Sequence, residues 1–231
     1  MKTIGLIGGM SWESSAEYYR LINTFVKERL GGFHSAKCVL VSVDFAEIET
    51  LQRENRWAES AQVLSSAAQS LERAGAEVVL LCTNTMHKVA DEIQASIHVP
   101  FLHIADATAD QIKTQGLSTV GLLGTRFTME EDFYVERLRQ RFELHVLIPE
   151  AGERAIIHRV IYDELVLGEI KTESKAQYLA VIDRLIERGA QSIILGCTEI
   201  GLLVQAGDCR VPVFDTTRVH AQAAVEWALS V

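Results

Sequence analysis

Two cysteines occupy matching places in the sequence, and each is followed directly by a threonine. Cys82 comes after the apolar run 78–81, and Cys197 comes after the largely apolar run 192–196. A thiol has an ordinary pKa of about 8.5, so near neutral pH it can serve as an acid or as a base. Two thiols on opposite sides of one carbon could therefore remove a proton from one face and return a proton to the other.

Electrostatics predicts how such a pair is protonated. Two sulfurs beside one small substrate resist double ionisation, because the first negative charge raises the pKa of the second thiol. One thiolate and one thiol is therefore the expected resting state. The residues after Cys82 and Cys197 are predicted to open helices, whose N-termini would lower the pKa of each thiol and would also hold carboxylates.

The elements that would position these thiols are alternating strands and helices. Apolar runs predict strands at 3–8, 37–43, 77–81, from 100 onward, and at 119–124, 144–148, 191–196 and 212–214. Helical patterns are predicted at 13–30, 57–71, 84–96, 105–115, 152–167, 172–188 and 217–229, with a short helix within 45–53. This alternation is typical of parallel sheets with right-handed crossovers, whose ligands lie beyond the carboxyl ends of the strands.

The second half of the chain repeats the first. The separation between Gly5 and Cys82 matches that between Gly121 and Cys197 to within one residue, and a Val-Pro strand follows each cysteine. Landmarks in the same order and spacing indicate two homologous units. We therefore predict an α/β fold of two pseudo-symmetric lobes, each with a mostly four-stranded parallel sheet flanked by helices, and an active site in the cleft between the lobes.

Three motifs resemble those of the aspartate/glutamate racemase family. They are GLIGGMS at 5–11, CTNT at 82–85 and GCTE at 196–199, and the resemblance covers nearly the whole chain. It implies racemisation of aspartate or glutamate without a cofactor, with Cys82 and Cys197 as the two bases, usually in a homodimer. It also implies that the chain crosses between lobes, so that one lobe comprises 1–104 plus 216–231 and the other comprises 105–215.

Polar residues near the strand ends are candidates for binding an acidic amino acid. Ser11 and Thr125 occupy equivalent turns after the first strand of each lobe, and the resemblance adds Met10, through its backbone, and Gln52. The full set of candidate binding residues is Met10, Ser11, Gln52, Thr83, Asn84, Thr85, Thr125, Thr198 and Glu199. Several of these side chains could instead serve only as helix caps.

Glu199 has two readings. It could be a solvated glutamate in a first helical turn, which is favourable there. It could also orient Cys197 or the substrate ammonium, since related glutamate racemases carry a histidine at this position. His87 and His103 are expected to be structural, because a scheme with two thiols needs no imidazole.

The residue that recognises the side-chain carboxylate of the substrate is not identified by sequence. Aspartate-selective members of the family place a basic residue in the helix that corresponds to 162–168, and this stretch has no lysine here. Arg53 is an alternative cation. The choice between aspartate and glutamate therefore stays open.

Composition excludes other classes of function. The 231 residues carry a net charge of −9, which disfavours nucleic-acid binding. No apolar run approaches the ~20 residues of a membrane span and no signal peptide is evident, so we expect a cytoplasmic protein. Cys38 and Cys209 are expected to be structural thiols, and no cysteines are spaced for a zinc site.

The sequence disfavours three other functions. A dinucleotide-binding enzyme is disfavoured because the glycines at 5–9 are not spaced as G-x-G-x-x-G. A related decarboxylase or isomerase acting on a small dicarboxylate would not need two matched cysteines. A non-catalytic amino-acid-binding protein would not need them either.

Overall fold

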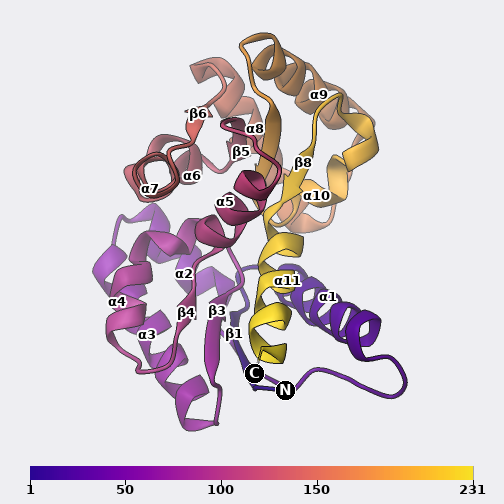
Figure 1. Ribbon diagram of the computed structural model, residues 1–231. Helices are drawn as coiled ribbons and strands as arrows, with labels where there is room; N and C mark the ends of the chain where they lie inside the picture. Colours follow the sequence, from indigo (N-terminus) through magenta and orange to yellow (C-terminus); the bar gives the residue numbers. More distant parts are fainter. Residues whose placement is uncertain (231) are drawn as a thin grey trace. The chain divides into compact units, whose positions relative to one another are not determined.

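The chain divides into two units. The computed structural model describes residues 1–230. One unit comprises residues 1–104 with the C-terminal segment from residue 217, and the other comprises residues 105–216. Figure 1 shows the chain entering and leaving the second unit once.

Each unit contains one parallel sheet of four strands. In the first, the strand order is β2-β1-β3-β4, and in the second it is β6-β5-β7-β8. The strands of the first unit are β1 (Ile4–Gly8), β2 (Cys38–Ser42), β3 (Val78–Leu81) and β4 (Phe101–Leu102). Those of the second are β5 (Thr119–Gly124), β6 (His145–Leu147), β7 (Ser192–Gly196) and β8 (Val213–Asp215). The order is the same in both sheets, which confirms the prediction of two four-stranded parallel sheets.

Helices connect the strands. Those of the first unit are α1 (Trp12–Leu30), α2 (Phe45–Arg53), α3 (Trp57–Arg73), the 3-10 helix η1 (Thr85–Val89), α4 (Ala90–Ala95) and α11 (Thr216–Leu229). Those of the second are α5 (Ile104–Thr114), α6 (Arg126–Glu130), α7 (Asp132–Phe142), α8 (Ala151–Asp163), η2 (Leu165–Leu167), α9 (Thr172–Glu187), α10 (Ile200–Leu203) and η3 (Ala206–Asp208). The single helix expected over 84–96 is therefore two short helices, η1 and α4.

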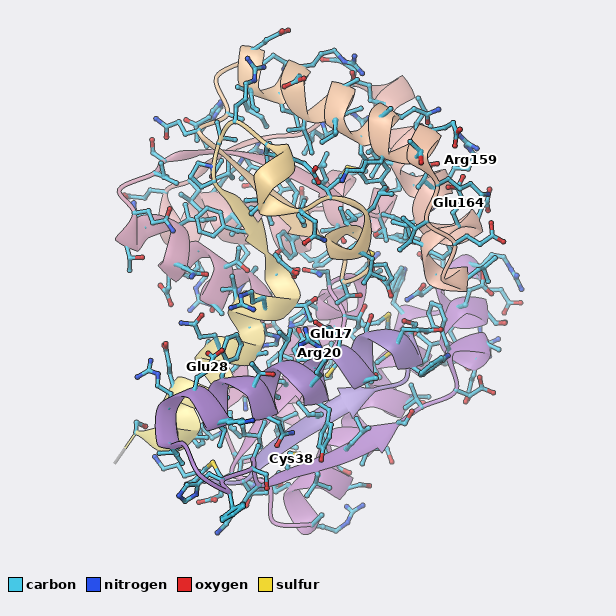
Figure 2. All side chains as sticks on the ribbon, turned by 90° about the vertical axis from the view of Figure 1, so that its right-hand side faces the viewer. Glu17, Arg20, Glu28, Cys38, Arg159 and Glu164 are labelled. Carbon is cyan, nitrogen blue, oxygen red and sulfur yellow. The ribbon has the colours of Figure 1, made fainter. Side chains whose placement is uncertain are left out.

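The central strands β1 and β3 are buried throughout. Successive side chains of a strand point to opposite faces of the sheet, so these strands contribute to a core on each side. Ile7 and Leu81 belong to a core cluster that includes residues of α3. Leu6 and Leu80 belong to a second cluster with residues of α1 and α11. The outward face of α1 carries a Glu17–Arg20 ion pair (Figure 2) and also exposes Trp12 and Tyr19.

A buried histidine ties α11 to the rest of the first unit. His220 accepts a hydrogen bond from the Tyr18 hydroxyl through Nδ1 (2.8 Å) and donates through Nε2 to the carbonyl of Leu102 (2.9 Å). The ring is wholly buried. Burial lowers the pKa of His220 to about 4, because the charged imidazolium would lose its hydration.

This histidine predicts a loss of stability in acid. The unfolded chain takes up a proton at His220 near pH 6.5, and the folded chain does so only near pH 4. The free energy of unfolding should therefore fall as the pH falls through this window, by up to about 3 kcal/mol from this residue. Urea unfolding of the wild type and of His220→Gln at several pH values measures the effect.

The glutamine variant should show a smaller loss of stability between neutral pH and pH 4 than the wild type. His98→Gln is the matched control, because the His98 side chain is 97% exposed. Equal pH dependence in the wild type and His220→Gln would contradict the prediction.

Candidate functional site

Cys82 lies directly after β3, at the carboxyl end of the strand. Its main-chain N–H donates to the carbonyl of Ile7 (2.9 Å), which extends the pairing of β3 with β1. The side chain is fully buried, in the cluster that includes Tyr18 and Ala221. Burial raises the pKa of the Cys82 thiol, because no opposite charge offsets the desolvation of a thiolate. The expected lowering of this pKa is therefore wrong.

The turn after Cys82 is also buried. Thr83, Asn84 and Thr85 expose less than a tenth of their surface. Asn84 precedes the five-residue helix η1, and its side chain makes no capping hydrogen bond to that helix. A short 3-10 helix that begins three residues after the cysteine has little macrodipole to offer the thiol.

Cys197 occupies the equivalent position after β7, and its thiol is hydrogen-bonded. Its Sγ donates to Oε2 of Glu199 (3.0 Å), and the hydroxyl of Thr198 donates to the same oxygen (2.7 Å). Glu199 is 5% exposed, so it is not the solvated residue that one reading of the sequence predicts.

The pKa of Cys197 lies well above its ordinary value. Burial is the largest cause, and the negative charge and hydrogen bond of Glu199 add to it. The main-chain N–H groups of Glu199 and Thr198 act in the opposite direction, because they stabilise a thiolate. The lowering that the sequence predicts is thus present at Cys197 but is outweighed.

This arrangement predicts the effect of Glu199→Gln. Glutamine removes the negative charge, so the pKa of Cys197 should fall and its alkylation by iodoacetamide should begin at a lower pH. Peptide mass spectrometry measures the alkylation of each cysteine as a function of pH. Cys82 serves as the internal control, and an unchanged profile for Cys197 would contradict the assigned role of the carboxylate.

The turns after the first strand of each unit are built alike. Ser11 caps α1 by accepting from the N–H of Ser14 (3.3 Å), and Thr125 caps α6 by accepting from the N–H of Thr128 (3.3 Å). Both cap residues are buried. The equivalence of these turns in the sequence therefore corresponds to an equivalent hydrogen-bonding pattern in each unit.

The remaining candidates lie in the first unit. Met10, before Ser11, is 4% exposed. Gln52 in α2 is buried and donates through Nε2 to the sulfur of Met86 (2.8 Å). Its neighbour Arg53 points to the surface and pairs with Glu49 (3.3 Å).

The sequence did not single out His220, and it predicted a structural role for His87. His220 lies in the alanine-rich helix α11. A histidine among these small apolar residues is the one feature of the sequence that hints at buried hydrogen bonds. Among residues 1–230, no group of three or more histidine, cysteine or acidic side chains is arranged to hold a metal ion. No helix in the same range is long and apolar enough to cross a membrane.

Comparisons of the sequence and of the structure with known proteins find racemases and their homologues. The model of the Asp/Glu/Hydantoin racemase family matches residues 7–224. A provisionally named Asp/Glu racemase from Yersinia pestis is 57% identical, with all of both chains covered and a TM-score of 0.94. An aspartate racemase homologue from Pyrococcus horikoshii is 35% identical over all of both chains, with a TM-score of 0.87. The broad specificity amino-acid racemase RacX from Bacillus subtilis is 24% identical over 74% of each chain.

Proposed function

Because this chain belongs to the Asp/Glu/Hydantoin racemase family, we propose that it racemises an acidic amino acid, aspartate or glutamate, without a cofactor. Cys82 and Cys197 are the proposed acid and base. The observation that carries the proposal is that each cysteine follows the equivalent strand of its unit, β3 or β7. We further propose that the chain forms two lobes, 1–104 with 216–231 and 105–215, and that each lobe contributes one of the two cysteines.

In the proposed reaction, a thiolate on one side removes the α-proton of the substrate, and the thiol on the other side donates its proton to the opposite face. The two cysteines exchange protonation states in each turnover, so atoms and charge balance. Burial disfavours a thiolate at either position, and the ammonium group of a bound amino acid would offset that penalty. Binding of the substrate is thus itself a means of forming the reactive thiolate.

The candidate binding residues supply hydrogen bonds in this scheme. Ser11, Thr125 and the Met10 backbone, together with Thr83, Asn84, Thr85 and Thr198, are proposed to bind the carboxylates of the substrate. Gln52 is proposed to contribute from α2. Hydrogen-bond donors in a water-poor site stabilise the charge that develops on the α-carboxylate as the proton leaves. Glu199, which accepts from Cys197, is proposed to orient that thiol.

Two observations favour a wider substrate range as a second candidate. The stretch 162–168 has no lysine. The relative from Bacillus subtilis is named a broad specificity amino-acid racemase. Uncharged amino acids therefore belong in the substrate panel beside aspartate and glutamate.

The test is exchange of the α-hydrogen. Purified protein is incubated in deuterated water with each amino acid, and proton NMR and chiral chromatography measure deuterium uptake and formation of the other enantiomer. Exchange with inversion of L-aspartate or L-glutamate, without added cofactor, is expected. Protein that binds an amino acid but exchanges none would overturn the proposal in favour of a binding protein.

The family resemblance also supports a homodimer, which sedimentation analysis would detect. The alternative enzyme class is a related decarboxylase or isomerase acting on a small dicarboxylate, and arylmalonate decarboxylase shares the fold at 13% identity and a TM-score of 0.57. Release of carbon dioxide from a small dicarboxylate would favour that class.

A further inference from the structure

Three buried histidines gather in the first unit, near the turn that follows Cys82. The ring of His87 lies 4.4 Å from that of His103 and 6.0 Å from that of His220, measured between centroids. All three side chains expose less than a tenth of their surface. The proposed reaction uses none of them.

Both ring nitrogens of His87 are hydrogen-bonded to main-chain groups. Nε2 lies 3.2 Å from the main-chain nitrogen of Ile104, and Nδ1 lies 2.8 Å from the carbonyl oxygen of Thr83. An amide N–H can only donate, so Nε2 must be the unprotonated acceptor. The proton of the neutral ring is therefore on Nδ1 and is donated to the carbonyl of Thr83.

The carbonyl that His87 holds controls the direction of the next amide. The Thr83–Asn84 peptide is trans. In a planar trans peptide the C=O and the following N–H point in opposite directions. Because the Thr83 carbonyl points toward His87, the Asn84 N–H points away from it.

The second hydrogen bond of His87 reaches a segment that lies further along the chain. Strand β4 has only two residues, and histidines bond the chain at its end and just beyond it. The carbonyl of Leu102, the last residue of β4, accepts from His220, and the N–H of Ile104 donates to His87. Ile104 is the residue at which the first unit ends. His87 thus joins the Cys82–Thr83 turn to the point where the chain crosses to the second unit.

We propose that His87 is a positioning residue that directs the Asn84 N–H toward a carboxylate of the substrate. The inference rests on the proposed function, because it assigns the Thr83–Asn84 peptide to substrate binding. A buried carbonyl left without its donor would turn toward another partner, and the amide on the same peptide plane would turn with it.

Two substitutions separate the two hydrogen bonds. Asparagine at position 87 places an amide N–H near the position of Nδ1, so it can still donate to Thr83. Glutamine reaches the position of Nε2, so it can still accept from Ile104 but loses the bond to Thr83. His98→Asn and His98→Gln are matched controls, because that side chain is 97% exposed.

The measurement is the separate effect on kcat and KM for the best substrate of the exchange panel. His87→Gln is expected to raise KM about tenfold, with a smaller change in kcat, since a misdirected amide weakens binding of the substrate. His87→Asn should stay within about threefold of the wild type, because its donor to Thr83 is retained. A purely structural role would destabilise both variants and leave KM unchanged.

Each outcome decides the inference. An active wild type with an unchanged KM in His87→Gln, or equal impairment in His87→Asn, would overturn the role of His87 and leave the proposed function intact. An inactive wild type would overturn both. Should the glutamine variant not fold, nitrogen-15 NMR of the wild-type ring still tests the geometry: protonation on Nδ1 is expected, and protonation on Nε2 would overturn the inference.

Discussion

Cys82→Ala and Cys197→Ala are each expected to reduce racemisation by at least about 10³-fold, because each removes an acid–base group from the reacting carbon. The fold-reduction in kcat/KM should be the same for conversion of the L-enantiomer and of the D-enantiomer. The two enantiomers have equal free energies in solution, so the ratio of kcat/KM for the two directions is fixed by the equilibrium constant. Initial rates from each enantiomer, measured by chiral chromatography, test both statements.

Cys38→Ala and Cys209→Ala are the matched controls, and both should retain wild-type activity. Cys38 begins the edge strand β2 (Figure 2), and Cys209 follows the short helix η3. Neither lies at the carboxyl end of β3 or β7. An alanine variant at Cys82 or Cys197 that keeps full activity would refute the scheme with two bases.

Serine variants can show whether each cysteine serves one face. Removal of a proton followed by loss of a β-substituent needs a base on one side only and no returned proton. Cys82→Ser and Cys197→Ser should therefore each retain elimination from a β-substituted substrate of one handedness while losing racemisation. Opposite handedness in the two variants is the expected result, and loss of elimination from both enantiomers would contradict it.

The internal repeat explains why the fold could be predicted from sequence. The run before Cys82 and the run before Cys197 are apolar and β-branched, and each is followed by a Val-Pro strand at matching spacing. These local patterns determine strands, and strands that alternate with helices determine parallel sheets. The prediction of two parallel sheets therefore needs no information about contacts between distant residues.

The electrostatics of the site could not be predicted in the same way. The direction of a thiol pKa shift depends on burial and on the identity of the neighbouring group, and sequence spacing specifies neither. The helix after Cys82 was expected to be regular, but η1 is a short 3-10 helix that leaves the thiol without a compensating charge. At Cys197 the decisive neighbour is Glu199, whose side chain turns back to the thiol rather than outward to water.

The hydrogen-bond partners of His87 could be predicted only in part, for a related reason. His87 follows Thr83 by four residues and could be assigned a local hydrogen bond from sequence. Its second partner, Ile104, is brought to it by the pairing of β4 with β3, so only the folded sheet shows that His87 joins the two segments. Buried polar side chains that join distant segments are in general invisible to periodicity.

Gly9→Ala is expected to destabilise the first unit by more than about 3 kcal/mol. Gly9 has φ +97°, a backbone conformation that residues with a side chain rarely adopt, and it lies against the end of β2. A Cβ at this position would overlap the carbonyl oxygen of Val43 and would lie 2.7 Å from its main-chain nitrogen. Those atoms belong to the backbone, and the Val43 N–H is bonded to the carbonyl of Gly8 (3.0 Å), so the clash cannot be relieved by a side-chain rotation.

Gly75→Ala separates the conformational strain from the clash. Gly75 has φ +89°, and a Cβ there would meet no atom within 4 Å, so only the strain of the left-handed backbone remains, about 1 kcal/mol. Urea unfolding of both variants measures the difference. A larger loss at Gly9 is required if a glycine is needed there for the turn that carries Met10 and Ser11 to approach β2. Equal losses would mean that backbone conformation alone explains the glycine, and that the turn does not depend on its close contact with Val43.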